Sequence, residues 1–177
     1  ESGSQAILDA MDKGTQVEQI YEATRLLKAK SVEVGFFLQF GYLDETLSDI
    51  HQTIKMVLDL MPDEIGVSVS YPLPGTKFFE KVQSQLDNKQ NWTDSDDLAM
   101  MYQATYSPAF YRRLHRYIHK IFRLRQGWLQ LRNSLRHPAQ LNARGLRAIL
   151  ATIYYLPAST LDYWLLRRLE NRSIARS

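Results

Sequence analysis

The sequence predicts an α/β fold with parallel strands, followed by an α-helical C-terminal extension. Two segments, 32–40 and 65–71, have the length and the apolar, β-branched and aromatic composition of strands, and segments with helical spacing flank them. Each segment runs into a loop that contains Gly or Pro, which ends the strand. Because ligands of α/β proteins bind at the carboxyl ends of parallel strands, these two loops are the first candidates for a functional site.

The first forty residues are predicted to form two helices and a buried strand. Residues 5–11 form a short helix, which ends at Lys13-Gly14 as a basic last turn followed by a glycine. Thr15 and Glu18 have the spacing of a capping box, which predicts the start of the second helix. The mostly apolar segment 32–40 is typical of a parallel strand that is covered on both faces.

The next segments are predicted to form a helix, a strand and a second helix. Apolar residues resume helical spacing at Leu47, and Pro62 ends that helix. The strand 65–71 alternates in polarity, and the Pro-rich loop 72–76 separates it from a helix that ends near Leu86. An order of helix, strand, helix, strand, helix is that of βα units with right-handed crossovers, so the two strands are predicted to be parallel.

Charge divides the chain into two regions. Residues 1–100 contain 8 Lys or Arg and 17 Asp or Glu, net −9, whereas residues 101–177 contain 14 and 2, net +12. A hydrophobic content of 45% and a charged content of 23% are those of a soluble globular protein. Together these features predict three parts: a first domain at 1–90, a linker at 91–105 and a basic helical extension at 106–177.

The extension is predicted to contain three helices. Spacings of three and four residues predict a long first helix with a buried stripe of Phe110, Leu114, Tyr117, Ile121, Leu124 and Trp128. His137-Pro138 ends this helix. Two more helices are expected at about 140–155 and 159–171, separated by Pro157, with Ser159 or Thr160 as the N-cap of the last one.

Cysteine is absent, which excludes disulfides and any Cys-held zinc or iron–sulfur cluster within these residues. His115 and His119 have the i, i+4 spacing of a helical zinc pair. The Glu of that motif is missing between them, and the neighbouring Arg116 and Lys120 disfavour a bound cation. We therefore predict no metal site and no catalytic residue in the chain itself.

Four motifs occur in a fixed order: Glu1-Ser2-Gly3-Ser4, Lys13-Gly14, Phe40-Gly41-Tyr42-Leu43-Asp44-Glu45-Thr46 and Tyr71-Pro72-Leu73-Pro74-Gly75-Thr76. Their order and spacing resemble the C-terminal half of a radical S-adenosylmethionine (SAM) core over about residues 1–110. The resemblance is greatest to the cobalamin-binding branch that includes the anaerobic magnesium-protoporphyrin ester cyclases. It implies that residues 1–90 are a partial (β/α) barrel fragment of a cytoplasmic radical SAM enzyme.

The resemblance also implies six cofactor-binding residues at the ends of three strands: Glu1, Ser2, Gly41, Glu45, Ser70 and Tyr71. The first two match the end of the family's fourth strand, where polar side chains hold the ribose and amino-acid parts of SAM. The next two match the fifth-strand motif beside the adenine, and the backbone of the last two matches the sixth strand at the adenine edge. For Glu45, a helix-start residue favoured by the helix dipole is an equal alternative.

Two positions depart from the family pattern. Leu43-Asp44 replaces the usual Pro-Gly before Glu45, which predicts a changed loop, and Ser31 stands where a glycine usually precedes the strand. The three-cysteine motif for the 4Fe–4S cluster and the cobalamin-binding domain would lie upstream of Glu1. The resemblance therefore implies a fragment that is inactive by itself, with SAM at its rim and with the cluster and cobalamin held by the intact parent.

The leading hypothesis is a fragment of an enzyme that modifies a small or porphyrin-like substrate by radical methylation, cyclisation or rearrangement, together with the upstream half of the same polypeptide. The alternative is a non-catalytic α/β module whose Arg-rich arm contacts RNA or an anionic membrane, although no nucleic-acid-binding signature is present. Three roles stay open for the arginines: docking on the acidic body, binding a substrate anion, or peripheral binding to a membrane through Trp128, Tyr154, Tyr155 and Trp164.

Overall fold

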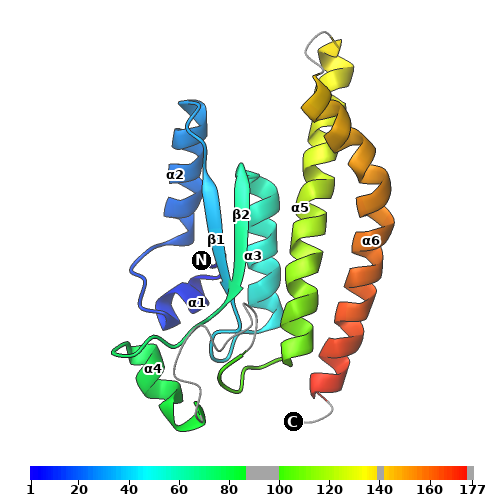
Figure 1. Ribbon diagram of the computed structural model, residues 1–177. Coiled ribbons are helices and arrows are strands. Elements are labelled where there is room, and N and C mark those ends of the chain that lie inside the picture. Colours follow the sequence, from blue (N-terminus) through cyan, green and yellow to red (C-terminus); the bar gives the residue numbers. More distant parts are fainter. Residues whose placement is uncertain (87–99, 139–141, 175–177) are drawn as a thin grey trace.

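The computed structural model describes residues 1–86, 100–138 and 142–174. It contains a mixed α/β body with a long helical hairpin beside it (Figure 1). The body consists of α1 (Gln5–Ala10), α2 (Val17–Ala29), β1 (Gly35–Phe40), α3 (Leu47–Leu60), β2 (Glu64–Val69), α4 (Lys77–Val82) and the 3-10 turn η1 (Gln83–Gln85). The hairpin consists of α5 (Pro108–Arg136) and α6 (Ala143–Ile174).

The two strands are parallel neighbours, which confirms the predicted pairing. Their register runs from Gly35 opposite Glu64 to Phe40 opposite Val69. Among the described residues they form one open, two-stranded sheet. Both strands are shorter than the predicted segments 32–40 and 65–71. The backbone before β1 bonds instead to Asp63, whose carboxylate accepts the Val34 N–H at 2.8 Å.

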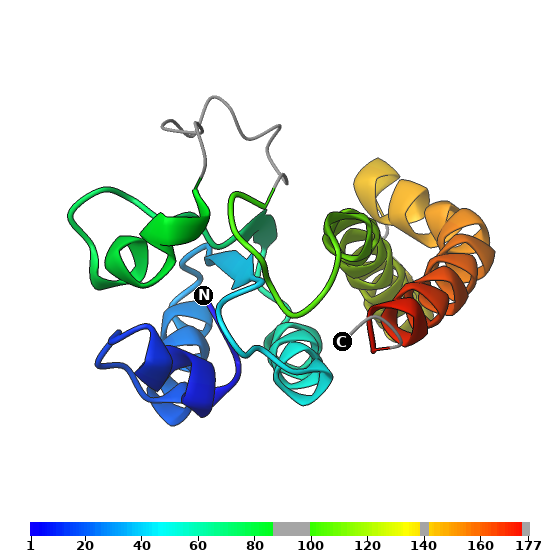
Figure 2. The same ribbon diagram turned by 90° about the horizontal axis from the view of Figure 1, so that it is seen from below.

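Only one face of the sheet is well covered by the described residues. Paired residues of parallel strands point to the same side, so Leu38 and Phe40 share a face with Val67 and Val69, and these belong to the main core. Helices α2 and α3 lie on one side of the sheet (Figure 2). On the other face Phe37 is 80% exposed. The prediction of a strand buried on both faces is therefore wrong for the described part of the chain.

The start of α2 differs from the predicted capping box by one residue. Its N-cap is Gln16, whose main-chain N–H donates to the Gln19 side chain at 2.8 Å. The Thr15 hydroxyl donates instead to the Lys13 carbonyl at 3.4 Å. A Gln side chain can make the same reciprocal bonds as the predicted Thr and Glu, which is why the motif moves by one position without changing the fold.

Helix α5 joins the hairpin to the body. Leu114, Ile118 and Phe122 are buried at successive turns, and α5 packs against β2 and α3. Beyond this region α5 extends past the body (Figure 1). Of the predicted stripe, Phe110 and Leu114 are fully buried, whereas Tyr117, Ile121 and Leu124 are only partly buried. The buried positions continue instead through Ile118 and Phe122, which were not predicted, and the prediction is wrong at Trp128, which is 54% exposed because the body does not reach it.

Helix α6 is continuous, so the predicted break at Pro157 is wrong. Proline removes the backbone N–H that would bond to the Ile153 carbonyl, but the helix continues through this position. Ser159 Oγ and Thr160 Oγ1 both donate to the Leu156 carbonyl, at 3.1 and 2.9 Å. These two residues were predicted as caps, yet they bond backward inside α6.

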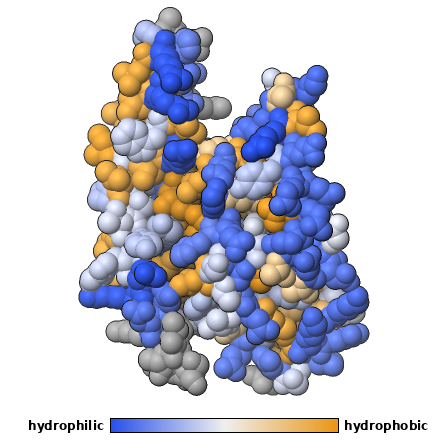
Figure 3. Space-filling view, turned by 180° about the vertical axis from the view of Figure 1, so that it is seen from behind, coloured by the Kyte–Doolittle hydropathy of each residue, from blue (hydrophilic) through white to orange (hydrophobic). Residues whose placement is uncertain are grey.

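The basic residues of the hairpin form ion pairs within the hairpin and not with the body, among the residues that the structure describes. Arg113 Nη1 and Lys120 Nζ of α5 lie 2.6 and 2.7 Å from the Asp162 carboxylate of α6. The hairpin docks on the body through apolar side chains of α5. Hydrophobic residues also gather along the outer edge of the hairpin, on the left of Figure 3.

Candidate functional site

The start of the chain and the carboxyl ends of β1 and β2 meet at one rim of the body. The Ser70 N–H donates to the Phe40 carbonyl at 2.8 Å and so extends the pairing of β1 and β2 by one residue. At the other edge of β1, the Gln39 N–H donates to the Glu1 carbonyl at 2.9 Å. The chain start, β1 and β2 therefore lie side by side in that order.

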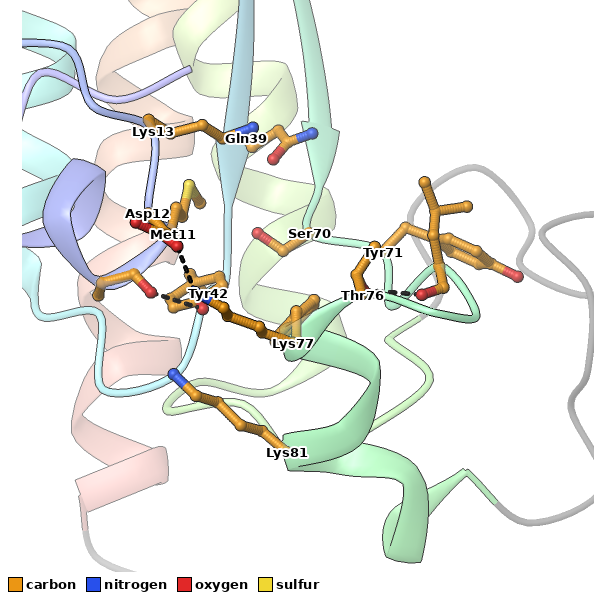
Figure 4. Close-up of a pocket in the computed structure, with 13 residues that line it drawn as sticks. Met11, Asp12, Lys13, Gln39, Tyr42, Ser70, Tyr71, Thr76, Lys77 and Lys81 are labelled. Atoms are coloured by element: carbon orange, nitrogen blue, oxygen red, sulfur yellow. Dashed lines mark hydrogen bonds and ion pairs between the residues drawn. The ribbon is translucent and has the colours of Figure 1, made fainter.

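A cavity of about 350 Å³ opens at this rim (Figure 4). It lies between the strand ends, the segment that follows α1 and the first turns of α4, and its size is within the range of small-molecule sites. Its lining residues are Ala10, Met11, Asp12, Lys13, Gln39, Tyr42, Ser70, Tyr71, Leu73, Thr76, Lys77, Phe78 and Lys81. Of the six residues predicted to bind a cofactor, Ser70 and Tyr71 line this cavity.

Charged groups of both signs surround the cavity. Lys13 Nζ lies 2.8 Å from the Glu1 carboxylate, and Lys77 Nζ lies 2.6 Å from the Asp12 carboxylate. The hydrogen bond and the charge of Lys77 lower the pKa of Asp12. Lys81 adds a third cation, which forms no ion pair within the described part of the chain. This arrangement suits a ligand that carries a carboxylate together with an ammonium or hydroxyl groups.

Ser70 and Tyr71 contribute to the cavity in different ways. Figure 4 shows the Ser70 hydroxyl directed toward the cavity, while the Tyr71 ring extends away from Tyr42 and Lys77. The backbone N–H of Ser70 is already bonded to Phe40, so it is not available to an adenine edge. The side chain of Ser70 lines the cavity, and its hydroxyl oxygen is buried without a hydrogen-bond partner among the described residues.

Ser2 is directed away from the cavity. Its hydroxyl is fully buried against α3, 3.1 Å from Thr53 Oγ1, and it also accepts the N–H of Ser4 at 3.1 Å. Gly3 fits closely beside it, because a Cβ there would lie 2.7 Å from the Gln52 carbonyl. Ser2 therefore fixes the chain start against α3, while Glu1 reaches the edge of the site through Lys13.

A hydrogen bond between Gly41 and Glu45 closes the loop after β1, and side chains from the chain beyond residue 99 cover it. Glu45 is fully buried, and its Oε2 accepts the Gly41 N–H at 2.6 Å. A Cβ at Gly41 would lie 2.8 Å from the Met100 methyl and 3.2 Å from the Tyr111 ring, so both side chains cover this glycine. The N-cap of α3 is Thr46, so Glu45 precedes the helix and is not its cap.

Burial changes the acid–base behaviour of Glu45. Desolvation raises its pKa to about 8; the hydrogen bond from Gly41 opposes this shift and the charge of Asp49 adds to it. Tyr102 also donates its hydroxyl to the Gly41 carbonyl. Glu45 thus holds a loop together from inside the protein, and it does not line the cavity.

Several cavity residues were missed by sequence reasoning. Lys13 and Tyr42 lie within the motifs discussed above, and Lys77 follows the Pro-rich loop directly, but no pattern indicated that their side chains converge. Tyr42 joins these parts, since its hydroxyl donates to the Ala10 carbonyl at 2.8 Å and its ring stacks on Phe78 with centroids 4.7 Å apart.

The two departures from the family pattern share one backbone feature. Ser31 and Asp44 have φ of 58° and 60°, the left-handed region that favours glycine. The loop before Glu45 therefore has a conformation suited to the glycine usual in the family, and Asp44 adopts it with some strain. The expected change of loop shape relative to the family remains a prediction; the structure shows only that Asp44 has a left-handed φ.

Asp44 allows a direct test of this strain. We expect Asp44→Gly to leave the protein as stable as the parent or slightly more stable, because Gly takes a left-handed φ without steric cost. Asp44→Ala should lower the free energy of unfolding by about 1 kcal/mol, because a short polar side chain such as Asp can bond locally in the left-handed region and Ala cannot. Urea denaturation of the two variants measures the difference. An Asp44→Ala variant as stable as Asp44→Gly would contradict the assigned conformation.

The pair His115 and His119 does not form a metal site with other described residues. Their ring centroids are 4.6 Å apart, and burial is the main cause that lowers the pKa of each. No group of three or more His, Cys, Asp or Glu suited to a metal ion occurs in residues 1–86, 100–138 and 142–174.

No family model matches the chain. Over 84 residues, 48% of the chain, it is 36% identical to a protein named as a methylthiotransferase from Methanocaldococcus jannaschii. It is 30% identical over 49% of its length to the anaerobic magnesium-protoporphyrin IX monomethyl ester cyclase of Cereibacter sphaeroides, and 31% identical over 52% to an uncharacterised methyltransferase of Pyrococcus horikoshii. The matches cover 19%, 14% and 20% of these relatives, so the similarity spans a fifth of their length at most.

Proposed function

We propose that this chain is the C-terminal part of a radical SAM enzyme and forms part of the rim that binds SAM. The three relatives, each similar over about half of the chain, are named for methylthio transfer, cyclisation and methyl transfer. In this proposal residues 1–90 belong to a partial (β/α) barrel, 91–105 link it to the rest, and 106–177 form a basic extension. Methylation, cyclisation or rearrangement of an organic substrate is the reaction class, and the cobalamin-dependent cyclase branch is the proposed origin.

One observation carries the proposal: the chain start, β1 and β2 end together around a cavity. The backbone bonds from Gln39 to Glu1 and from Ser70 to Phe40 support this proposal, because they give the chain start, β1 and β2 the order that the resemblance implies for the fourth, fifth and sixth strands. A cavity at the carboxyl ends of parallel strands is where barrel enzymes bind their ligands.

The groups around the cavity fit SAM. The carboxylate of SAM would be bound by Lys13 or Lys77, and its ammonium or ribose hydroxyls by Glu1 and the Ser70 hydroxyl. The 4Fe–4S cluster does not fit this chain, because the sequence contains no cysteine. We therefore assign no cluster ligand, no cobalamin ligand and no radical step to these residues, and propose that the upstream half of the polypeptide supplies them.

Ser2, Gly41 and Glu45 were predicted to bind a cofactor, but they do not line the cavity and would act indirectly in this proposal. Ser2 fixes the chain start on α3, and Glu45 closes the loop at Gly41. They are positioning residues, which hold the rim in shape while Lys13 and Ser70 contact the ligand.

The binding role can be tested with a charge reversal and a matched control. We expect Lys13→Glu to weaken binding of S-adenosylhomocysteine, used as a stable probe, at least about tenfold in calorimetric titration, which corresponds to about 1.4 kcal/mol. Lys55→Glu reverses an exposed lysine on α3 that does not line the cavity, and it should bind like the parent.

The enzymatic role needs the complete polypeptide, with its upstream half. Formation of 5′-deoxyadenosine from SAM after cluster reconstitution would support the proposal, and Lys13→Glu should lower its rate. Absence of this product from the reconstituted complete protein would overturn the enzymatic proposal. Binding of the probe without any product would overturn the enzymatic role and favour the alternative from another functional class, a non-catalytic α/β binding module.

A further inference from the structure

We propose that the outward face of α6 lies on an anionic phospholipid membrane surface. This inference is independent of the proposed enzyme activity, because it rests on the hairpin alone. The hairpin is suited to this role because α5 lies between α6 and the body, as Figures 1 and 2 show, so that the body does not cover the far side of α6.

The far side of α6 carries a stripe of exposed apolar side chains. The stripe contains Leu146, Leu150, Ile153, Leu161 and Trp164, each between 47% and 74% exposed. Their spacings of three and four residues, continued through Pro157, keep them on one face of the helix. Residues 148–166 contain a single charged residue, Asp162, and it faces α5. An apolar face of this length on a soluble domain marks a docking surface.

Cations border the two ends of this stripe. Arg147 at one end and Arg167 and Arg168 at the other are exposed. The Arg168 guanidinium lies 3.5 Å from the centroid of the Trp164 ring, a cation–π contact. Trp and Tyr beside Arg are typical of membrane interfaces, where the ring lies at the headgroups and the cation meets lipid phosphate.

The hairpin has almost no negative charge to repel an anionic surface. Asp162 and Glu170 are the two acidic residues in 101–177, and both are largely buried and ion-paired, Asp162 with Arg113 and Lys120, and Glu170 with Arg167. Residues 101–177 carry a net charge of +12, and among the described residues Arg147, Arg167 and Arg168 of α6 are exposed. Each basic residue near an anionic lipid surface adds about 1 kcal/mol of attraction.

These features favour a membrane surface over the other occupants. A surface that binds RNA carries cations along its middle, whereas this face of α6 carries Leu, Ile and Trp there. A second copy of the chain would bring two strongly cationic hairpins together. No described helix is long and apolar enough to cross a bilayer. The helix is thus proposed to lie in the interface, with Tyr154 and Trp164 exposed to it, whereas Tyr155 is only partly exposed and Trp128 lies on α5.

Vesicle flotation of the full chain tests the proposal. We expect binding to phosphatidylcholine vesicles that contain 30% phosphatidylserine, weaker binding at high salt, and little binding to pure phosphatidylcholine. The double variant Ile153→Gln with Leu161→Gln should bind at least about tenfold less, because two apolar anchors are lost. Leu26→Gln is the matched control, because Leu26 is 62% exposed but lies on α2, outside the hairpin. This variant should bind vesicles like the parent.

A second readout follows the helix itself. Tryptophan emission should shift to shorter wavelength on binding, and the shift should be reduced in Trp164→Phe. Equal binding to charged and uncharged vesicles would overturn the anionic specificity. Absence of vesicle binding would overturn the proposal. Binding of RNA instead would identify RNA as the partner of this face. A dimer that is detected by ultracentrifugation and is abolished by Ile153→Gln with Leu161→Gln would identify a second copy of the chain as the partner.

Discussion

Replacing Asp162 by Asn is expected to lower the free energy of unfolding by about 3 kcal/mol, because one buried carboxylate compensates two cations. Its side chain is 1% exposed, while Arg113 and Lys120 are 25% and 22% exposed. Without the carboxylate, two positive charges would face each other at the contact between α5 and α6. Breaking a fully buried pair costs more, and partial exposure of the cations moderates the loss.

Denaturant unfolding of matched variants isolates this effect. Lys55→Gln removes an exposed ion pair with Asp59 and should cost less than about 1 kcal/mol. A variant that combines Asp162→Asn with Arg113→Gln and Lys120→Gln should lose less stability than the sum of the separate changes, since no cation is left without its partner. An Asp162→Asn protein as stable as the Lys55→Gln control would contradict the assigned ion pairs.

The same carboxylate predicts a dependence on pH. Burial alone would raise the pKa of Asp162, but the hydrogen bonds and charges of Lys120 and Arg113 outweigh it and hold the pKa below its ordinary value. The stabilisation is therefore complete above the ordinary pKa of 3.8 and is lost as the pH falls through the lower, folded-state value. Asp162→Asn should lack this part of the acid denaturation.

Local patterns predicted the parallel pair of strands, while features that depend on tertiary distances were not predictable. Alternation and proline are local signals, so the segments around β1 and β2 were identified and only their ends were wrong. The exposure of Trp128 depends on how far the body reaches along α5, which no local pattern contains. The prediction of a break at Pro157 was wrong because the sequence does not show that packing of α6 along α5 outweighs the one hydrogen bond that proline removes.

The site shows the same division between local and tertiary information. The sequence indicated which strand ends converge, because parallel strands of one sheet share a rim. It did not indicate where side chains point, so Ser2 was assigned to the ligand although it contacts Thr53. Lys77 was missed because it approaches the rim from α4, outside the strand-end motifs. The side chains at such a rim follow from packing and not from spacing.

Glu45 is expected to make the protein less stable as the pH rises from about 4.5 to about 8. Its pKa is about 8 in the folded state against an ordinary 4.5, so in this range the unfolded chain releases a proton that the folded protein keeps. Each pH unit in the window lowers the free energy of unfolding by about 1.4 kcal/mol, for a total of a few kcal/mol. Below 4.5 both states hold the proton, and the stabilisation is complete.

Glu45→Gln separates this contribution from all other titrating groups. The amide oxygen can accept the Gly41 N–H as the carboxyl group does, and the variant cannot ionise. We expect the variant and the parent to have similar stability at pH 5, and the variant to be more stable by a few kcal/mol at pH 9. The measurement is the difference between their urea midpoints across this range. A constant difference would mean that Glu45 is already ionised in the folded protein. That result would favour an exposed Glu45 carboxylate that can bind ribose or an ammonium group. The proposal that Glu45 only positions the loop beneath Met100 and Tyr111 would then be wrong.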